Sequence, residues 1–442
     1  MKKVYEQPFI IQHKGGIINK FGEQRRTQVC DNLEGIKISE LIKQFGSPLF
    51  VYSEKKMKDQ HGRLIDAFTR RYPKVRHAWS YKTNYIKAVC NTFHNLGSWA
   101  EVVSGMEYEM AKRLGVSPSK IIFNGPFKPY QVLKTALIEG AMVNIDSMDE
   151  LYDAEKIAQE IDNTVNVGIR LNMELGTFKS WDRFGFNIDS KEALRAVKRA
   201  LIGRKITITG LHCHIGTFIL DPELYRLEIK KLIEFAITIK KEFDITIKYI
   251  DIGGGFASRN KLKGSYFPTD ESVPSFDRYA QVITDELILA FKPDEIPLLI
   301  IETGRALIDE CGSLISTVGA VKRLPSGMRA IIMDAGVNIL FTSFWYYHDI
   351  IPAVDRGIAL EDHIVYGPLC MQIDVIHPQI KLPHLEKGDA VVIKPVGAYN
   401  NTQWMQFIQL RPNVVMIRDN GTVSIIREAE SIDYLQANDK LL

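Results

Sequence analysis

The hydrophobic positions of the chain follow a repeated alternation between residues 76 and 304. Short runs rich in β-branched residues are followed by longer stretches with a helical period, such as 147–161 and 221–243. The second stretch opens with Asp-Pro-Glu, which is typical of a helix N-terminus. The short runs predict strands at 76–82, 98–103, 120–125, 141–146, 166–172, 209–216, 248–255 and 297–304. Eight strands that mostly alternate with helices predict a parallel (β/α)8 barrel, with an open doubly wound sheet as the alternative.

The pattern changes after about residue 306, where strands and turn signals replace the helical period. An Asn-Gly pair at 420–421, between two apolar runs, indicates a β-hairpin. We therefore predict a C-terminal β domain over 307–442 and a barrel over 47–306. The N-terminal segment 1–46 contains a strand-like run at 9–22, and we expect this segment to pack with the β domain.

Composition indicates a soluble, cytoplasmic protein. Hydrophobic residues make up 45% and charged residues 25%, and the formal net charge is only +3, which gives no reason to expect nucleic acid as a partner. No stretch is long and apolar enough to suggest a signal peptide or a membrane span. The five cysteines are scattered without a CxxC pair, which argues against a disulfide framework or a cysteine zinc site and suits a reducing compartment.

The predicted strand ends carry chemically useful side chains. The active site of a (β/α)8 barrel lies at these ends, which here hold Lys82, Glu101, Asn124, Asp146, Arg170, His214, Gly253–Gly255, Glu302 and Arg305. A lysine can form a Schiff base, a glycine-rich turn can hold a phosphate with its N–H groups, and a buried carboxylate can keep a pyridine nitrogen protonated. Together these residues indicate a pyridoxal phosphate site.

The stretch "GLHCHIGT" (210–217) contains two histidines that are also candidates for a metal site. Residues two apart on a strand share a face, so His212 and His214 should point inward while Cys213 faces the helices. A metal would need a third ligand, and the sequence offers no obvious one. We therefore expect no metal, and we interpret His212 as a hydrogen-bonded core residue.

The same residues have ordinary structural interpretations. Lys82 alone could be a solvated strand-end lysine, Gly253–Gly255 a tight turn, and Cys370 a buried apolar thiol. Residues 344–349, "FWYYHD", suit a hydrophobic core as well as a substrate contact. Glu107 and Glu109, in the helix predicted after the second strand, are expected to be surface charges.

The motifs resemble, nearly end to end, the barrel-type pyridoxal-phosphate decarboxylases of the alanine-racemase-like fold, which include diaminopimelate and ornithine decarboxylases. Seven segments match in the family's order: "SYKTN", "EVVSGME", "GLHCHIGT", "DIGGGF", "ETGR", "GPLCMQID" and "VGAY". "ETGR" departs from the family's usual proline at its second position but keeps the spacing of the Glu and the Arg. The resemblance implies amino-acid decarboxylation by a carbon–carbon lyase.

The resemblance also assigns roles to residues. It implies that Lys82 carries the cofactor, that His214 stacks on its ring, that Glu302 pairs with its nitrogen and that Cys370 protonates the α-carbon. The cofactor-binding set it implies is Lys82, Glu101, Arg170, His214, Thr217, Gly253, Gly254, Gly255, Glu302, Thr303, Gly304, Arg305 and Tyr399. In the family the segment matching "GPLCMQID" comes from the partner subunit, so the resemblance implies a homodimer with shared sites.

The substrate is an amino acid whose side-chain contacts differ from those of the family. Diaminopimelate decarboxylases carry an arginine where this chain has Thr342 and a glutamate where it has Met371. Two charged contacts are thus neutral here, which predicts a neutral, larger or conjugated side chain on the substrate. Free diaminopimelate is the default substrate of the family but fits these contacts poorly. The candidate substrate residues are Thr342, Tyr346, His348, Asp349, Met371 and Asp374.

Two other functions remain as alternatives at this point. A racemase would need a second base opposite Lys82, and the resemblance places Cys370 there rather than the racemase tyrosine. Racemases of this type also carry an arginine where this chain has Glu302. A non-catalytic relative would bind the cofactor without turnover, and the presence of Lys82, Glu302, Cys370 and Asp374 together argues against it.

Overall fold

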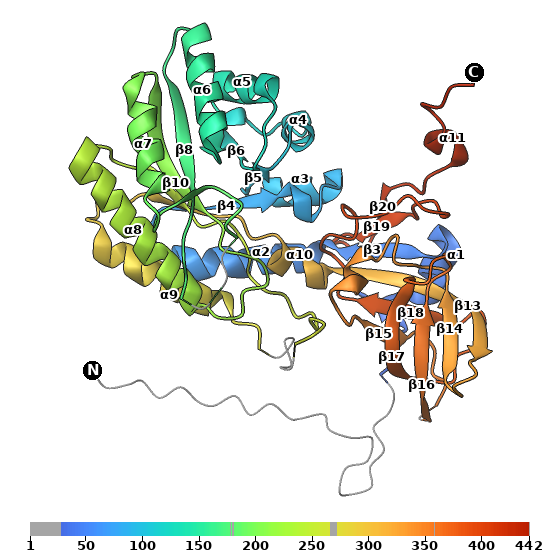
Figure 1. Cartoon of the computed structure of the whole chain (residues 1–442). Coiled ribbons are helices and arrows are strands. Elements are labelled where there is room, and N and C mark those ends of the chain that lie inside the picture. Colours follow the sequence, from blue (N-terminus) through green and yellow to red (C-terminus); the bar gives the residue numbers. More distant parts are fainter. Residues whose placement is uncertain (1–27, 177, 179–180, 266–271, 358, 442) are drawn as a thin grey trace, which may run out of the picture.

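The computed structural model describes residues 28–176, 178, 181–265, 272–357 and 359–441. The strand-like run at 9–22 lies outside these residues. Figure 1 shows a barrel and a β domain side by side, with β3 and α10 near the place where they meet.

The larger part of the molecule is a closed parallel barrel. Each of the eight predicted runs overlaps one barrel strand: β4 (Val75–Ser80), β5 (Trp99–Val102), β6 (Ile121–Phe123), β7 (Met142–Ile145), β8 (Val165–Asn172), β10 (Ile206–Cys213), β11 (Tyr249–Asp251) and β12 (Leu298–Ile301). Their order is β10-β11-β12-β4-β5-β6-β7-β8, and β8 pairs back onto β10, with Leu171 opposite Cys213. This closure confirms the barrel and excludes an open sheet. The short β9 (Phe186–Asn187) extends β8.

Helices cover the outside of the barrel. They are α2 (Glu54–Thr69), α3 (Lys87–Asn95), α4 (Gly105–Arg113), α5 (Tyr130–Glu139), α6 (Met148–Glu160), α7 (Glu192–Ile202), α8 (Glu223–Phe243), α9 (Phe276–Ala290) and α10 (Arg305–Ile308). The predicted helical stretches 147–161 and 221–243 correspond to α6 and α8. The side chains of β10 point in the predicted directions. His212 points into the barrel toward Glu302, and Cys213 packs near Glu228 of α8.

Two strand-to-helix turns use the same capping device. The Ser104 and Ser147 hydroxyls accept hydrogen bonds from the Glu107 and Glu150 N–H groups at the starts of α4 and α6. Each glutamate in turn accepts the N–H of the residue before the serine, at 2.7 Å in both cases. The prediction that Glu107 is a surface charge was therefore wrong: it is 4% exposed, and burial raises its pKa to about 7.

The β domain is built mainly from strands after residue 311. These are β13 (Gly312–Arg323), β14 (Arg329–Met333), β15 (Asp349–Pro352), β16 (Leu360–Tyr366), β17 (Val375–Pro383), β18 (Ala390–Lys394), β19 (Val414–Ile417) and β20 (Val423–Arg427), with the terminal α11 (Ile432–Leu435) beyond them. β19 and β20 form the predicted Asn-Gly hairpin, and Gly421 has a φ of +79°.

The start of the described chain also belongs with this sheet. After the short pair β1 (Asn32–Leu33) and β2 (Ile36–Lys37), α1 (Ile38–Phe45) packs its apolar face on β-domain residues that include Ile315 and Val415. β3 (Leu49–Ser53) falls in the range 47–306 assigned to the barrel, but it pairs with β13 and β19. The barrel prediction therefore began too early, because the apolar run of β3 is completely buried and looks like a barrel strand.

All five cysteines are free thiols. Within the described part of the chain, no helix combines the length and the apolar character needed to cross a membrane.

A buried ion pair holds the ends of β6 and β7 together. The Lys128 ammonium, which is 0% exposed, donates to Glu150 Oε1 at 2.8 Å and to the Gly125 and Asn144 carbonyls at 3.0 and 2.9 Å. Removing one partner of such a pair leaves an uncompensated charge away from water.

We predict that Lys128→Met lowers the free energy of unfolding of the barrel by roughly 3–5 kcal/mol. The matched control is Lys134→Met, which breaks the more exposed pair with Glu160 and should have a much smaller effect. Guanidinium denaturation followed by circular dichroism measures both. Equal effects of the two substitutions would contradict the importance of the buried pair.

Candidate active site

A cavity of about 740 Å³ opens at the C-terminal ends of the barrel strands. Twelve of the residues predicted to bind the cofactor or the substrate line it: Lys82, Glu101, Arg170, His214, Thr217, Gly254, Gly255, Glu302, Gly304, Arg305, Tyr346 and Tyr399. Asn124, also predicted at a strand end, lines the cavity as well. Gly253 and Thr303 lie behind this wall, where the Gly253 N–H bonds to Asp251 and the Thr303 carbonyl to His77. Strands far apart in the sequence thus deliver their terminal side chains to one space.

Lys82 lies just beyond β4 in the short turn η1 (Tyr81–Thr83). Its Nζ donates to Glu101 Oε2 at 2.5 Å, and the same oxygen accepts the Ser80 hydroxyl at 2.6 Å. Burial alone would lower the pKa of Lys82, but the Glu101 and Glu302 carboxylates raise it above its ordinary value. Lys82 is therefore an ammonium group until a ligand changes its surroundings.

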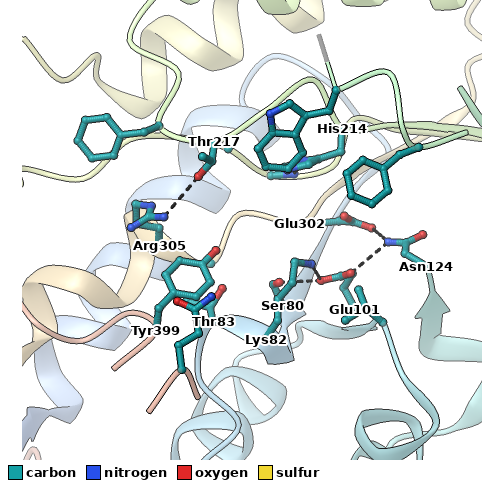
Figure 2. Close-up of a pocket in the computed structure, with 18 of the residues that line it drawn as sticks. Ser80, Lys82, Thr83, Glu101, Asn124, His214, Thr217, Glu302, Arg305 and Tyr399 are labelled. Atoms are coloured by element: carbon teal, nitrogen blue, oxygen red, sulfur yellow. Dashed lines mark hydrogen bonds and ion pairs between the residues drawn. The ribbon is translucent and has the colours of Figure 1, made fainter. Parts of the chain in front are cut away.

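Glu302 follows β12 and faces the cavity from the side opposite Arg305 (Figure 2). Its Oε1 accepts from Asn124 Nδ2 at 2.6 Å, and Asn124 Nδ2 also donates to Glu101 Oε1 at 3.2 Å. Although burial opposes ionisation, His212, the hydrogen bond with Asp251 and the Lys82 cation hold the pKa of Glu302 below its ordinary value. One wall of the cavity therefore carries a fixed carboxylate.

His214 is held in its neutral form. Burial and the cations of Lys82 and Arg170 lower its pKa to about 3. Its Nδ1 accepts the Gly254 N–H at 3.1 Å, so the other ring nitrogen carries the proton. The rings of Trp181 and His214 are in an edge-to-face arrangement, with their centroids 5.4 Å apart. At Gly253 the φ of +63° and the nearby imidazole leave no room for a side chain, since a Cβ would lie 2.7 Å from His214 Nδ1.

Arg305 forms a cationic end to the cavity. Its Nη2 donates to the Thr217 hydroxyl at 3.3 Å, while the buried Nη1 has no hydrogen-bond partner in the described part of the chain. The rings of Tyr399, Tyr346 and Phe218 surround the guanidinium at 4.6, 5.4 and 5.8 Å. A buried cation with an unused donor, walled by aromatic rings, is a site for an anion.

Tyr399 comes from the β domain and has a φ of +66°, which is unusual for a bulky residue. Its N–H donates to the Thr83 carbonyl at 2.8 Å, and the Thr402 hydroxyl donates to the Lys82 carbonyl at 2.8 Å. The β domain therefore holds the backbone of the Lys82 turn by two hydrogen bonds. The phenol ring of Tyr399 lies beside Arg305 (Figure 2).

A family model described as "Pyridoxal-dependent decarboxylase, pyridoxal binding domain" matches residues 58–309. The chain belongs to the pyridoxal-dependent decarboxylases. It is an enzyme of the carbon–carbon lyase class that uses pyridoxal phosphate, so the racemase and non-catalytic alternatives are set aside.

Relatives of the decarboxylase match over nearly their whole length. The diaminopimelate decarboxylase of Methanocaldococcus jannaschii is 31% identical over 427 residues, which cover 92% of this chain and 94% of the relative. That of Aquifex aeolicus is 29% identical over 416 residues, 91% of this chain and 94% of the relative. The crystal structure of the M. jannaschii enzyme in complex with L-lysine has a TM-score of 0.85 at 29% identity and covers 94% of this chain and 98% of that one.

Several predicted substrate residues do not reach the cavity. Thr342 and His348, both buried, bond to each other at 2.9 Å inside the β domain, and Thr342 also bonds to Asn400. Asp349 pairs with Lys261 away from the cavity lining. These three residues therefore do not line the cavity of this chain, and their contact with the substrate stays a prediction. Tyr346 alone among the six candidates lines the cavity.

The loop that carries Cys370 also lies outside the cavity lining. Cys370 is exposed and Met371 partly so. Asp374 is 2% exposed and organises the loop by accepting the Val337 and Leu369 N–H groups at 2.8 and 2.7 Å. Its carboxylate is thus used within the β domain.

The structure supplies the third polar group that the sequence did not show beside His212. One ligand atom each from His212, Asp251 and Glu302 lies within 4.8 Å of the others. The expectation that His212 is a hydrogen-bonded core histidine was wrong in one respect. Its ring nitrogens have no hydrogen-bond partner among the described residues, and Nε2 is 3.6 Å from Glu302.

Many residues of the cavity lining were not predicted from the sequence. The unpredicted lining residues include Ser80, Thr83, Trp181, Phe184, Phe218, Leu262, Lys263 and Gln403. Most lie in loops after the strands, where no periodic pattern marks a residue that faces inward. Ser80 was accessible to the same reasoning as Lys82, because it lies two positions before it at a strand end.

Proposed function

We propose that Lys82 attaches the cofactor, with Arg305 and Glu302 binding its two ends. The residues fit such a group: a buried guanidinium with an unused donor suits a phosphate, and a fixed carboxylate opposite suits a protonated ring nitrogen. Lys82 lies between these ends in Figure 2, and this placement is the observation that carries the proposal. Pyridoxal phosphate, when bound, stabilises the electron pair that remains at the α-carbon after carbon dioxide leaves.

The other residues act on this arrangement from fixed positions. Thr217, Gly254, Gly255 and Tyr399 complete the phosphate end beside Arg305. The neutral His214 packs on the ring face without adding a competing cation. Glu302 holds the proton on the ring nitrogen, and the absence of an arginine at this position favours decarboxylation over racemisation. Glu101 and Arg170 orient Lys82 and the ring edge.

Lys82 also moves protons. Its ammonium, held beside Glu101, must lose a proton before its nitrogen can bind the cofactor, and Glu101 lies at 2.5 Å to accept it. When the substrate amine replaces Lys82, the freed amine remains within reach of the same carboxylate.

We further propose that the substrate is an amino acid whose distal end is neutral or conjugated. The two carboxylates of the lining, Glu101 and Glu302, are both engaged as described above. The part of the lining that does not contact the cofactor is mainly aromatic and aliphatic, and consists of Trp181, Phe184, Phe218, Leu262, Phe344 and Trp345. Lys263 adds a further cation to it. Among the described residues, no lining carboxylate is left to pair with a distal ammonium group such as that of diaminopimelate.

We predict that kcat/KM for neutral-ended amino acids exceeds that for diaminopimelate by at least about tenfold. An unpaired charge in a buried site costs several kcal/mol, which suppresses a rate by orders of magnitude. The measurement is carbon dioxide release from a panel of diaminopimelate, lysine, ornithine, arginine, neutral-ended amino acids and amino-acid conjugates. A wide margin in favour of diaminopimelate, the substrate named for the relatives, would contradict this part of the proposal.

We also propose a cytoplasmic homodimer in which each site takes Cys370 from the second copy. Cys370 is exposed and absent from the cavity lining of its own chain, so a thiol that protonates the α-carbon must be supplied by another chain. The free cysteines suit a reducing compartment.

We predict that mixing inactive Lys82→Ala with inactive Cys370→Ala protein restores up to about a quarter of the wild-type activity. Random subunit exchange makes half of the dimers hybrid, and in each hybrid one of the two sites is intact. A mixture of Lys82→Ala with a Lys82→Ala, Cys370→Ala double variant is the control and should stay inactive. Failure of the first mixture, with exchange confirmed by mass spectrometry, would show that each chain builds its own site.

A further inference from the structure

Beneath the active-site cavity lies a buried polar group whose role the site described above does not explain. Asp251 ends β11 and is 0% exposed, between His212 on β10 and the strand that leads to Glu302. Its Oδ1 accepts the Gly253 N–H at 2.9 Å. Among the residues that the structure describes, none donates a hydrogen bond to its Oδ2. A carboxylate oxygen buried without a donor would be costly.

One side-chain oxygen of Asp251 lies within 4.8 Å of one of Glu302. Two buried carboxylates this close to each other are not both ionised, so one of them holds a proton. The proton belongs on Asp251 for geometric reasons. Glu302 faces the cavity and already receives the Asn124 amide at 2.6 Å, whereas a proton on Asp251 Oδ2 gives that oxygen the role of donor that its surroundings require.

The electrostatic surroundings agree with this assignment. Burial and the neighbouring Glu302 carboxylate raise the pKa of Asp251 well above its ordinary value. Burial lowers the pKa of His212 below its ordinary value, although the Glu302 carboxylate opposes this shift.

We infer that Asp251 is a positioning residue that carries a proton, donates it in a hydrogen bond to Glu302, and so keeps Glu302 as an oriented carboxylate. The same side chain holds the Gly253 N–H, so one carboxyl group connects the glycine loop at the phosphate end to the carboxylate at the ring end. This inference rests on the proposed pairing of Glu302 with the ring nitrogen.

A buried divalent cation is the competing explanation of the same three side chains. A cation would need Asp251 to be ionised, and it would use the free oxygen of Asp251 together with His212 and Glu302. The two explanations differ in what they require at position 251: a hydrogen-bond donor in the first and a negative charge in the second.

The test compares Asp251→Asn, Asp251→Ala and Glu302→Gln proteins in three measurements. These are the dissociation constant of pyridoxal phosphate, the position of its visible absorption band, and the metal content by mass spectrometry. Asparagine can donate to Glu302 through its NH₂ group and still accept from Gly253. Asp251→Asn should therefore bind the cofactor within about threefold of wild type with an unshifted band, while Asp251→Ala should bind roughly 10- to 100-fold more weakly.

The inference is overturned if Asp251→Asn binds as weakly as Asp251→Ala, if Asp251→Ala binds as tightly as wild type, or if a stoichiometric metal is present and lost in Asp251→Asn. If the alanine protein does not fold, the asparagine protein decides alone. The Glu302→Gln protein separates a failure of the pairing between Glu302 and the ring nitrogen from a failure of the role of Asp251. An unshifted band in that protein refutes the pairing of Glu302 with the ring, whereas a shifted band with a weakly binding Asp251→Asn protein refutes only the role of Asp251.

Discussion

The chain of hydrogen bonds from Lys82 through Glu101 and Asn124 to Glu302 sets the charge of the whole site. It places one partly exposed cation beside two buried carboxylates, whose interactions are stronger than those of carboxylates at the surface. The chain can form only because β12 pairs with β4, which brings the last barrel strand beside the first. The chemistry therefore depends on the closure of the barrel.

The β domain contributes to the same site through backbone contacts. The loop 399–402 fixes the Lys82 turn, and the strained backbone of Tyr399 holds its ring against Arg305. Asp309, just after α10, strengthens this junction by accepting bonds from Ser258, Asn260 and the Ala398 N–H. A substitution of Asp309 should disturb the position of Lys82, even though Asp309 lies beyond the last barrel strand.

The parts of this arrangement that follow a local period could be predicted from the sequence. The alternation of apolar runs and helical stretches located all eight barrel strands, and the position of a residue at a strand end indicated Lys82, Glu101, His214 and Glu302. Contacts between distant loops carry no such period. For this reason Trp181, Phe184 and Phe218 were missed in the cavity lining. The strand β3 was assigned to the barrel because its apolar run looks like a barrel strand, although it pairs with β13 and β19. The buried position of Glu107 was missed because a capping glutamate and a surface glutamate look alike in sequence.

We propose that Lys82, held between an anion-binding end and a carboxylate, attaches the cofactor. Reduction of the cofactor-loaded enzyme with borohydride, followed by peptide mass spectrometry, locates the pyridoxyl group. Among the described residues, Lys82 and Lys263 are the lysines that line the cavity, so the experiment has a built-in competitor. We expect the pyridoxyl label on the peptide that contains Lys82, and we expect no label in the Lys82→Ala protein. A label on Lys263, or labelling that persists in the Lys82→Ala protein, would contradict the proposal.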